Sequence, residues 1–187
     1  MPKEMPEEGA ERKGADQTAE GPLLRVLFLC TGNSCRSIMA EALARHLFPP
    51  GMAVDSAGSK PSGTVNPKAL ATLLREGIPA TGLASKSWES LSGGYDLVVT
   101  LCDGAAGESC PIVLTQAVRV HWGLSDPAKA EGSEEEIDRA FFRAFLTIRK
   151  RIELFILQVE KASGEGPRRL PSREILESIG TAIGTDG

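Results

Sequence analysis

The stretch Cys30-Thr31-Gly32-Asn33-Ser34-Cys35-Arg36-Ser37 stands between two segments of different character. The apolar run 24–29 before it is typical of a buried parallel strand, and residues 38–44 after it are typical of the first turns of a helix. A turn from a strand into a helix aims backbone N–H groups and a helix N-terminus at one point, which suits an oxyanion. The sequence therefore predicts an oxyanion site formed by Thr31, Gly32, Asn33, Ser34, Cys35, Arg36 and Ser37.

Cys30 and Arg36 give this turn its chemistry. A helix N-terminus and a neighbouring cation both favour the thiolate of Cys30, which is the nucleophilic form of cysteine. The hydroxyl of Ser37 is placed to donate to that sulfur, whereas we expect the side chain of Cys35 to pack behind the loop. A cysteine and an arginine at this spacing also occur by chance. The alternative interpretation is therefore a buried structural cysteine and a surface arginine. The strand, the turn residues and the helix around the pair favour a nucleophile and an anion clamp.

Segments typical of strands and of helices alternate from residue 23 onward. The expected strands cover residues 24–30, 52–56, 95–101 and 117–122, and the expected helices cover 37–48, 66–76, 85–91 and about 133–162. This order predicts an α/β fold, a three-layer sandwich in which helices cover both faces of a four-stranded parallel sheet. Ligands of such sheets bind beyond the carboxyl ends of the strands, which is where Cys30 falls.

Length and composition indicate one domain with two tails. The chain has 187 residues and a net charge of −4. Residues 1–22 hold almost no large apolar side chain and are expected to form a disordered tail, residues 23–162 form the domain, and residues 163–187 form a C-terminal tail. Residues 172–183 of that tail are expected to form a short amphipathic helix, which docks on its own domain or on a partner.

The charge and the apolar pattern argue against several classes of partner. A net negative charge argues against nucleic acid or a membrane surface as a partner held by general electrostatics. No apolar run has the length of a membrane span, and the N-terminus lacks the layout of a signal peptide. We therefore expect a cytoplasmic protein whose four cysteines are reduced and serve chemistry rather than structural disulfides.

Two further cysteines frame a segment of small residues. Cys102 closes an expected strand, and Cys110 follows after a segment, 103–109, that is rich in glycine and alanine. We interpret this segment as a loop that moves Cys102 towards Cys30, because a disulfide needs closely spaced Cα atoms. The alternatives are two buried cysteines without chemical consequence, or a zinc site made of the four cysteines and His121. The gap between Cys102 and Cys110 is wide for structural zinc ligands, so we expect no bound metal.

The loop Gly123-Leu124-Ser125-Asp126-Pro127 follows the last expected strand at the same edge of the sheet. There the carboxyl group of Asp126 can protonate an oxygen that leaves the bound oxyanion. The alternative is a turn aspartate that caps its own backbone. The spacing alone does not separate these two interpretations.

The motifs resemble those of a known family. The segment CTGNSCRSxMAE (30–41), preceded by the strand VLFLC (26–30), resembles the arsenate reductases built on the low-molecular-weight protein tyrosine phosphatase fold. The resemblance continues through DSAGS (55–59), NPKAL (66–70), VTLCDGAAGESCP (99–111) and HWGLSDP (121–127). It covers residues 24–160, and the segment with Cys102 and Cys110 points to the reductase branch.

The resemblance implies a reaction sequence. Arsenate, or its analogues phosphate and sulfate, binds the loop with Arg36 on its oxygens, and Cys30 attacks arsenic while Asp126 donates a proton. Cys102 then attacks the Cys30 sulfur and releases arsenite, and Cys110 takes over the disulfide. No cofactor is bound, and the external reductant is thioredoxin, or glutathione with glutaredoxin.

Two alternatives and one ion remain open. A phosphatase that hydrolyses a Cys30 phosphoenzyme would use the same Arg36 and Asp126, and would need neither of the later cysteines. A non-enzymatic sensor of arsenic or redox state is the third interpretation. In some members of the family a potassium ion binds near the loop; Asn33, Glu41 and Ser56 match that pattern, but Ser87 stands where an aspartate is expected.

Overall fold

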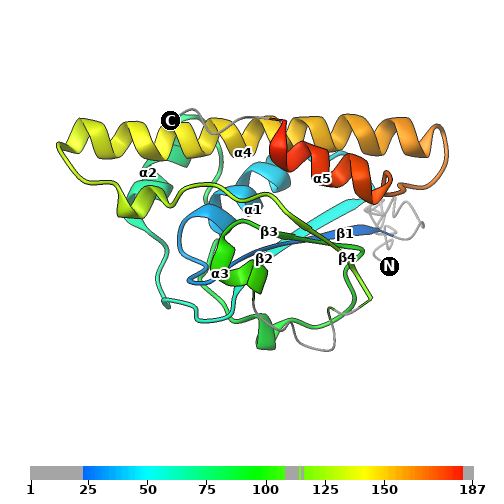
Figure 1. Cartoon of the computed structure of the whole chain (residues 1–187), viewed down its shortest axis with the longest axis horizontal. Coiled ribbons are helices and arrows are strands. Elements are labelled where there is room, and N and C mark those ends of the chain that lie inside the picture. Colours follow the sequence, from blue (N-terminus) through cyan, green and yellow to red (C-terminus); the bar gives the residue numbers. More distant parts are fainter. Residues whose placement is uncertain (1–22, 108–113, 115, 183–187) are drawn as a thin grey trace, which may run out of the picture.

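Four parallel strands form the centre of the molecule in the order β2-β1-β3-β4 (Figure 1). The computed structural model describes residues 23–107, 114 and 116–182. The strands are β1 (Leu24–Cys30), β2 (Met52–Gly58), β3 (Leu97–Thr100) and β4 (Val118–His121), so the predicted four-stranded parallel sheet is confirmed. Because β1 lies between β2 and β3, Cys30 ends in the middle of the carboxyl edge, paired with Gly58.

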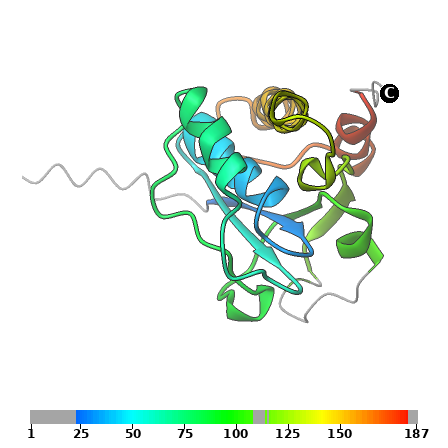
Figure 2. The same cartoon turned by 90° about the vertical axis from the view of Figure 1, so that its left-hand side faces the viewer.

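Four helices pack on one face of this sheet, and Figure 2 shows them together on that side. They are α1 (Arg36–Leu47), α2 (Pro67–Arg75), α4 (Glu134–Ser163) and α5 (Arg173–Thr181). Two of them begin where the sequence signals predict. The side chain of Asn66 accepts the first N–H groups of α2, and Ser133 forms a capping box with Glu136 at the start of α4.

Alternate residues of β1 enter two separate cores, as the two-residue period of a strand requires. Val26 and Phe28 belong to the larger core, which α1, α2, α4 and α5 complete. Leu27 and Leu29 belong to a smaller core on the other face. That core is closed by the 3₁₀ turn η1 (Trp88–Ser90) and helix α3 (Asp103–Gly107), with Trp88, Cys102 and Ala105 buried. The sheet thus lies between a thick helical layer and a thin one.

Helix α3 differs from the expectation drawn from the sequence. The sequence predicts a loop after Cys102, because two glycines in five residues disfavour an isolated helix. The structure shows that the Cys102 Sγ accepts the N–H of Ala105 at 3.4 Å and that Asp103 places an acid in the first turn. Both contacts stabilise a helix start. The loop prediction is therefore wrong for 103–107, while Cys110 lies outside the described residues.

Two other segments differ in extent from their predictions. The helix expected over 85–91 is reduced to η1, whose capping residue Ser87 accepts the N–H of Glu89. In the C-terminal tail, α5 packs against β4 and α4. Ile183, assigned to that helix, and the tail 1–22 lie outside the described residues. In the part of the chain that the structure describes, no helix is both long and apolar enough to cross a membrane.

Candidate active site

The loop between β1 and α1 has its carbonyl groups bound on its outer side. Those of Thr31, Gly32 and Ser34 accept the backbone N–H groups of Lys60, Ser62 and Asn66 at 2.9, 2.9 and 2.8 Å. Because the C=O and N–H of one peptide unit point in opposite directions, the next N–H groups along the loop face its inner side. Among the described residues, the amides of 32–36 have no hydrogen-bond acceptor. This arrangement fits the predicted oxyanion site at the start of α1.

Asn33 fixes the shape of the loop. Its φ of +42° lies in the left-handed region, which asparagine tolerates better than most residues. The buried side chain donates from Nδ2 to the hydroxyls of Ser37 and Ser56, both at 2.9 Å, and its Oδ1 accepts the N–H of Lys86 at 2.7 Å. Three hydrogen bonds from three directions leave the loop one conformation.

Cys30 lies at the centre of this loop and is 4% exposed. Its Sγ is 2.8 Å from the hydroxyl oxygen of Ser37, as the sequence predicts. Since that oxygen already accepts from Asn33, the Ser37 hydrogen is free to be donated to the sulfur. Ser37 is the second residue of α1, so the start of that helix lies against the Cys30 sulfur.

Arg36 and Asp126 are brought together across the sheet edge. Arg36 Nη2 donates to Asp126 Oδ2 at 2.8 Å, and Nη1 donates to the carbonyl of Leu124 at 3.1 Å. The other carboxylate oxygen of Asp126 accepts the N–H of Ala128 at 3.1 Å and caps the 3₁₀ turn η3 (Pro127–Lys129). The carboxyl group therefore caps a turn, and it also pairs with the predicted anion clamp, while its role as a proton donor stays a prediction.

Cys102 lies directly against the same loop. The N–H of Thr31 donates to Cys102 Sγ at 3.3 Å, and the Thr31 hydroxyl is 3.4 Å from that sulfur. Helix α3 comes so close that a Cβ on Gly104 would lie 2.8 Å from the Thr31 hydroxyl oxygen. Cys30, Cys35 and Cys102 are free thiols. The structure thus brings Cys102 beside the residue that follows Cys30.

The side chain of Cys35 points into the larger core, as expected, and is 4% exposed. Burial raises the pKa of this thiol, and the negative charge of Asp126 raises it further. Cys35 therefore stays protonated and serves the site through its backbone. In the described part of the chain, no group of three or more Cys, His, Asp or Glu side chains is arranged to hold a metal ion.

Glu41, which the sequence indicates only for a potassium site, is a buried carboxylate behind the loop. Glu41 is fully buried and accepts from the hydroxyl of Ser56, which in turn contacts Asn33. Its charge is balanced by Arg45, one helical turn away, and by Lys86 Nζ at 3.4 Å. The spacing of Glu41 and Arg45 is visible in the sequence, whereas the contact with Lys86 is not. These residues do not fit a further cation, because two side chains already supply the positive charge.

His121 joins β4 to α3. Its Nδ1 is 2.8 Å from the hydroxyl of Thr100, and its Nε2 is 3.2 Å from a carboxylate oxygen of Asp103. The sequence shows no partner for this histidine, because both partners belong to other elements of the fold. The contact links the helix that follows Cys102 to the strand that leads to Asp126.

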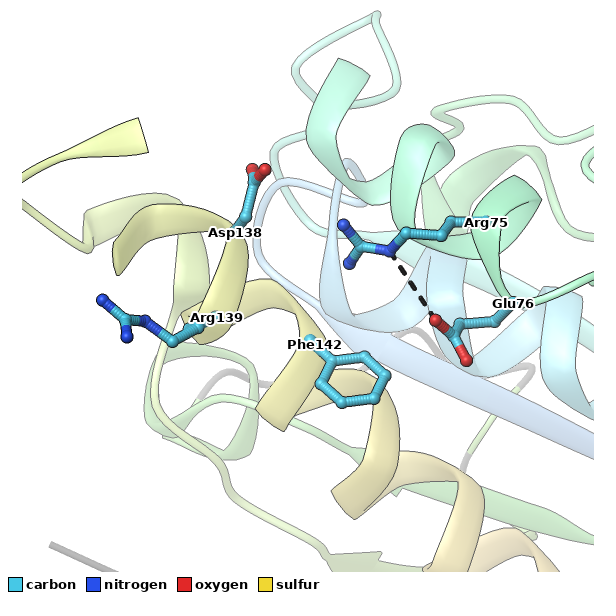
Figure 3. A pocket seen from close by; sticks show the side chains of 5 residues that line it. All are labelled: Arg75, Glu76, Asp138, Arg139 and Phe142. Carbon is cyan, nitrogen blue, oxygen red and sulfur yellow. Dashed lines mark ion pairs between the residues drawn. The ribbon is translucent and has the colours of Figure 1, made fainter. Parts of the chain in front are cut away.

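A shallow groove lies elsewhere, between α2 and α4. Figure 3 shows the side chains that line it, namely Arg75, Glu76, Asp138, Arg139 and Phe142. Arg75 pairs with Glu76 at 3.6 Å and lies over the ring of Phe142. No residue of the loop 30–37 lines this groove, and it holds no nucleophilic side chain.

Comparison with known proteins agrees with the site. Residues 25–164 match the family described as low molecular weight phosphotyrosine protein phosphatase. The chain is 44% identical over 131 residues to an arsenate reductase of Halalkalibacterium halodurans, covering 70% of this chain and 93% of that protein. An arsenate reductase of Bacillus subtilis is 41% identical over the same shares of both chains.

Solved structures of arsenate reductases are also similar to this chain. One described as an arsenate reductase in the phosphate binding state superposes with a TM-score of 0.61 at 31% identity, covering 72% of this chain and 98% of that one. A thioredoxin-dependent arsenate reductase of Corynebacterium glutamicum gives a TM-score of 0.51 at 27% identity, covering 72% of this chain and 64% of that one. The chain therefore belongs to the low molecular weight phosphotyrosine protein phosphatase family and, within it, to the arsenate reductases.

Proposed function

We propose that this chain reduces arsenate to arsenite with Cys30 as the nucleophile and Cys102 as the second thiol. The observation that carries the proposal is the position of Cys102, whose sulfur contacts Thr31 next to Cys30. Reduction of arsenate requires two electrons, which two neighbouring thiols supply when they form a disulfide. The arsenate reductases that this chain resembles support the same assignment.

In the first step, arsenate binds to the N–H groups of the loop and to Arg36. The Cys30 thiolate attacks arsenic and forms a sulfur–arsenic bond, while one arsenic–oxygen bond breaks. The Asp126 carboxylate, 2.8 Å from the Arg36 guanidinium, first takes up a proton from solvent and then gives it to the departing oxygen, which leaves as water. The phosphate-bound relative supports an oxyanion in this loop, so phosphate and sulfate are expected to compete.

In the second step, the Cys102 thiolate attacks the Cys30 sulfur. A disulfide forms, the electron pair of the sulfur–arsenic bond moves to arsenic, and arsenic leaves as arsenite in the +3 state. The N–H groups of Thr31 and Ala105 both donate to the Cys102 sulfur and hold it beside the loop. The two sulfurs have then lost the two electrons that arsenic has gained.

The third step restores Cys30. Cys110 attacks Cys102, forms the Cys102–Cys110 disulfide and releases the Cys30 thiolate. An external thiol then returns two electrons, and the thioredoxin-dependent relative supports a thioredoxin as that reductant. Glutathione with glutaredoxin is the other candidate.

The second candidate function is that of a phosphatase. Cys30, Arg36 and Asp126 form a complete nucleophile, clamp and acid without Cys102. The same site therefore has the groups to form and hydrolyse a Cys30 phosphoenzyme. This activity needs water in place of the second thiol.

Variants of the two cysteines test the proposal. Cys30→Ser is expected to abolish both arsenite formation from arsenate and hydrolysis of an aryl phosphate. Cys102→Ser is expected to abolish arsenite formation, with thioredoxin and its reductase present, and to retain any aryl phosphate hydrolysis. Arsenite formation at the unmodified rate in folded Cys102→Ser would overturn the assignment of the second thiol.

A further inference from the structure

The C-terminal helix α5 lies outside the part of the chain that matches the family, which ends at residue 164. Figure 1 shows it, in red, alongside α4 and above β4. Its residues Leu176 and Ile179 are buried in the larger core, whereas Glu174 on the opposite side is exposed. This helix therefore lies beyond the part that matches the family and packs next to β4, the strand that leads to Asp126.

Helix α5 accepts hydrogen bonds from two buried donors, Trp122 directly after β4 and Arg151 of α4. Trp122 Nε1 donates to the carbonyl of Leu176 at 2.8 Å. Arg151 of α4 donates from Nη2 to the carbonyl of Gly180 at 2.8 Å, and from Nη1 to the carbonyls of Trp122 and Gly123 at 2.7 and 3.2 Å. The guanidinium of Arg151 thus joins α4, α5 and the start of the segment that leads to Asp126.

Arg151 holds this position although its burial is costly. The side chain is 2% exposed, and burial lowers the pKa of its guanidinium. Its described acceptors are backbone carbonyls, one of which only α5 provides. Loss of that carbonyl leaves a charged donor buried without its acceptor.

The clamped segment leads directly to the active site. Trp122 and Gly123 are followed by Leu124, whose carbonyl accepts from Arg36 at 3.1 Å, and by Asp126, which pairs with Arg36 at 2.8 Å. A displacement of the segment at Trp122 is therefore passed on to both contacts of Arg36. Reactions that depend on a placed proton donor lose rate steeply when the donor moves by about 1 Å.

We propose that α5 is a positioning element for Asp126, acting through Arg151 and the Trp122–Leu124 segment, and that it sets the rate of the proton-dependent first step. The proposal rests on the proposed function for that step alone. Removal of α5 slows formation of the arsenic adduct without changing the chemistry of Cys102.

Gly180 offers a substitution that separates docking of α5 from its formation. A Cβ at this position would lie 2.6 Å from the carbonyl oxygen of His121 and 2.8 Å from Trp122 Cδ1. Gly180→Ala therefore displaces α5, while alanine favours the helix itself. A chain that ends at Leu170 removes the helix altogether, and Glu174→Ala on the exposed side of α5 is the matched control.

The test is a double-mutant cycle with Asp126→Asn, measured as the single-turnover rate of thiol loss after arsenate is added. Gly180→Ala and the shortened chain are expected to lose about tenfold in rate, and Glu174→Ala to lose nothing. In the Asp126→Asn background, the same changes are expected to lose less than about twofold, because the group they position is absent. A purely structural helix would lower the rate by the same factor in both backgrounds.

Equal factors in the two backgrounds, or an unchanged rate in Gly180→Ala, would overturn the proposal even if the shortened chain fails to fold. The cycle is repeated with phenyl phosphate, whose leaving group also needs a proton. If arsenate removes no thiols from the unmodified chain, the reductase proposal is contradicted. If the losses with phenyl phosphate are still non-additive in that case, the proposed role of α5 stands.

Discussion

The backbone N–H of Thr31 donates to Cys102 Sγ at 3.3 Å, and the Thr31 hydroxyl lies 3.4 Å from the same sulfur. Thr31 follows the nucleophile Cys30 in the chain, so one residue serves as a wall of the oxyanion loop and as a hydrogen-bond partner of the second thiol. This contact holds the sulfur of Cys102 against the residue that follows Cys30. On the proposed mechanism, Cys102 attacks the Cys30 adduct from a position that α3 and Thr31 fix.

Thr31→Val removes the hydroxyl from Cys102 and keeps the shape of the side chain. A hydrogen bond to a charged group contributes about 1.5–3 kcal/mol, so formation of the Cys30–Cys102 disulfide is expected to slow by about tenfold or more. Quenched-flow mapping of the disulfide measures this step. Affinity for phosphate is expected to stay within about twofold, and Thr81→Val is an exposed control. An unchanged rate of disulfide formation would show that the hydroxyl does not assist attack by Cys102.

Asp126→Asn keeps the hydrogen bond to Arg36 but removes the proton that the first step needs. Loss of a placed general acid costs about a hundredfold in rate, so kcat for arsenate is expected to fall by about that factor. Phosphate inhibition is expected to persist, because the loop amides and Arg36 remain in place. A fall in kcat of less than about threefold would assign the carboxyl group to capping η3 alone.

Lys86→Met removes one of the two positive charges beside the buried carboxylate of Glu41. The unmodified enzyme is expected to work equally well in potassium chloride and choline chloride, since Arg45 and Lys86 already balance Glu41. The variant is expected to lose activity in choline chloride and to recover part of it in potassium chloride. Lys150→Met on the exposed face of α4 is the control. Strong potassium dependence of the unmodified enzyme would contradict this assignment.

Cys35 gives the stability of the fold a dependence on pH. Burial raises the pKa of the folded thiol, whereas an unfolded cysteine has a pKa of about 8.5. The contribution is fully present below the unfolded pKa. Above it the unfolded chain releases a proton that the folded chain keeps, so the free energy of unfolding falls by up to about 1.4 kcal/mol per pH unit. Urea unfolding between pH 7 and 10 should show a smaller fall in Cys35→Ala, and identical slopes would contradict the assignment.

The sequence predicts the elements whose signals are local. The apolar runs and caps place all four strands of the sheet and the starts of α2 and α4 within about two residues, because helix and strand periods depend on neighbouring residues. Cys30, Arg36 and Ser37 could also be singled out locally, because they lie within one short stretch, 30–37. Local sequence signals do not predict helix α3, because its start is stabilised by the sulfur of Cys102 and by packing against Thr31.

Contacts between distant segments are the other limit. Lys86 and Glu41 are 45 residues apart, and Arg36 and Asp126 are 90 residues apart. A capping aspartate and a proton donor have the same sequence pattern at Asp126. Only the fold shows that this carboxyl group caps η3 and also pairs with Arg36. The role of α5 is equally invisible, because its acceptors are backbone carbonyls that any sequence provides.

The most direct test of the account is a count of free thiols in fully reduced, desalted protein before and after arsenate, with phosphate as the control, followed by mapping of the disulfide. The account predicts that arsenate, and not phosphate, removes two thiols per chain and that the disulfide joins Cys102 to Cys110. A disulfide between Cys30 and Cys102 alone would keep the reductase and remove Cys110 from the relay. An unchanged thiol count in both samples would contradict the relay of cysteines in this chain.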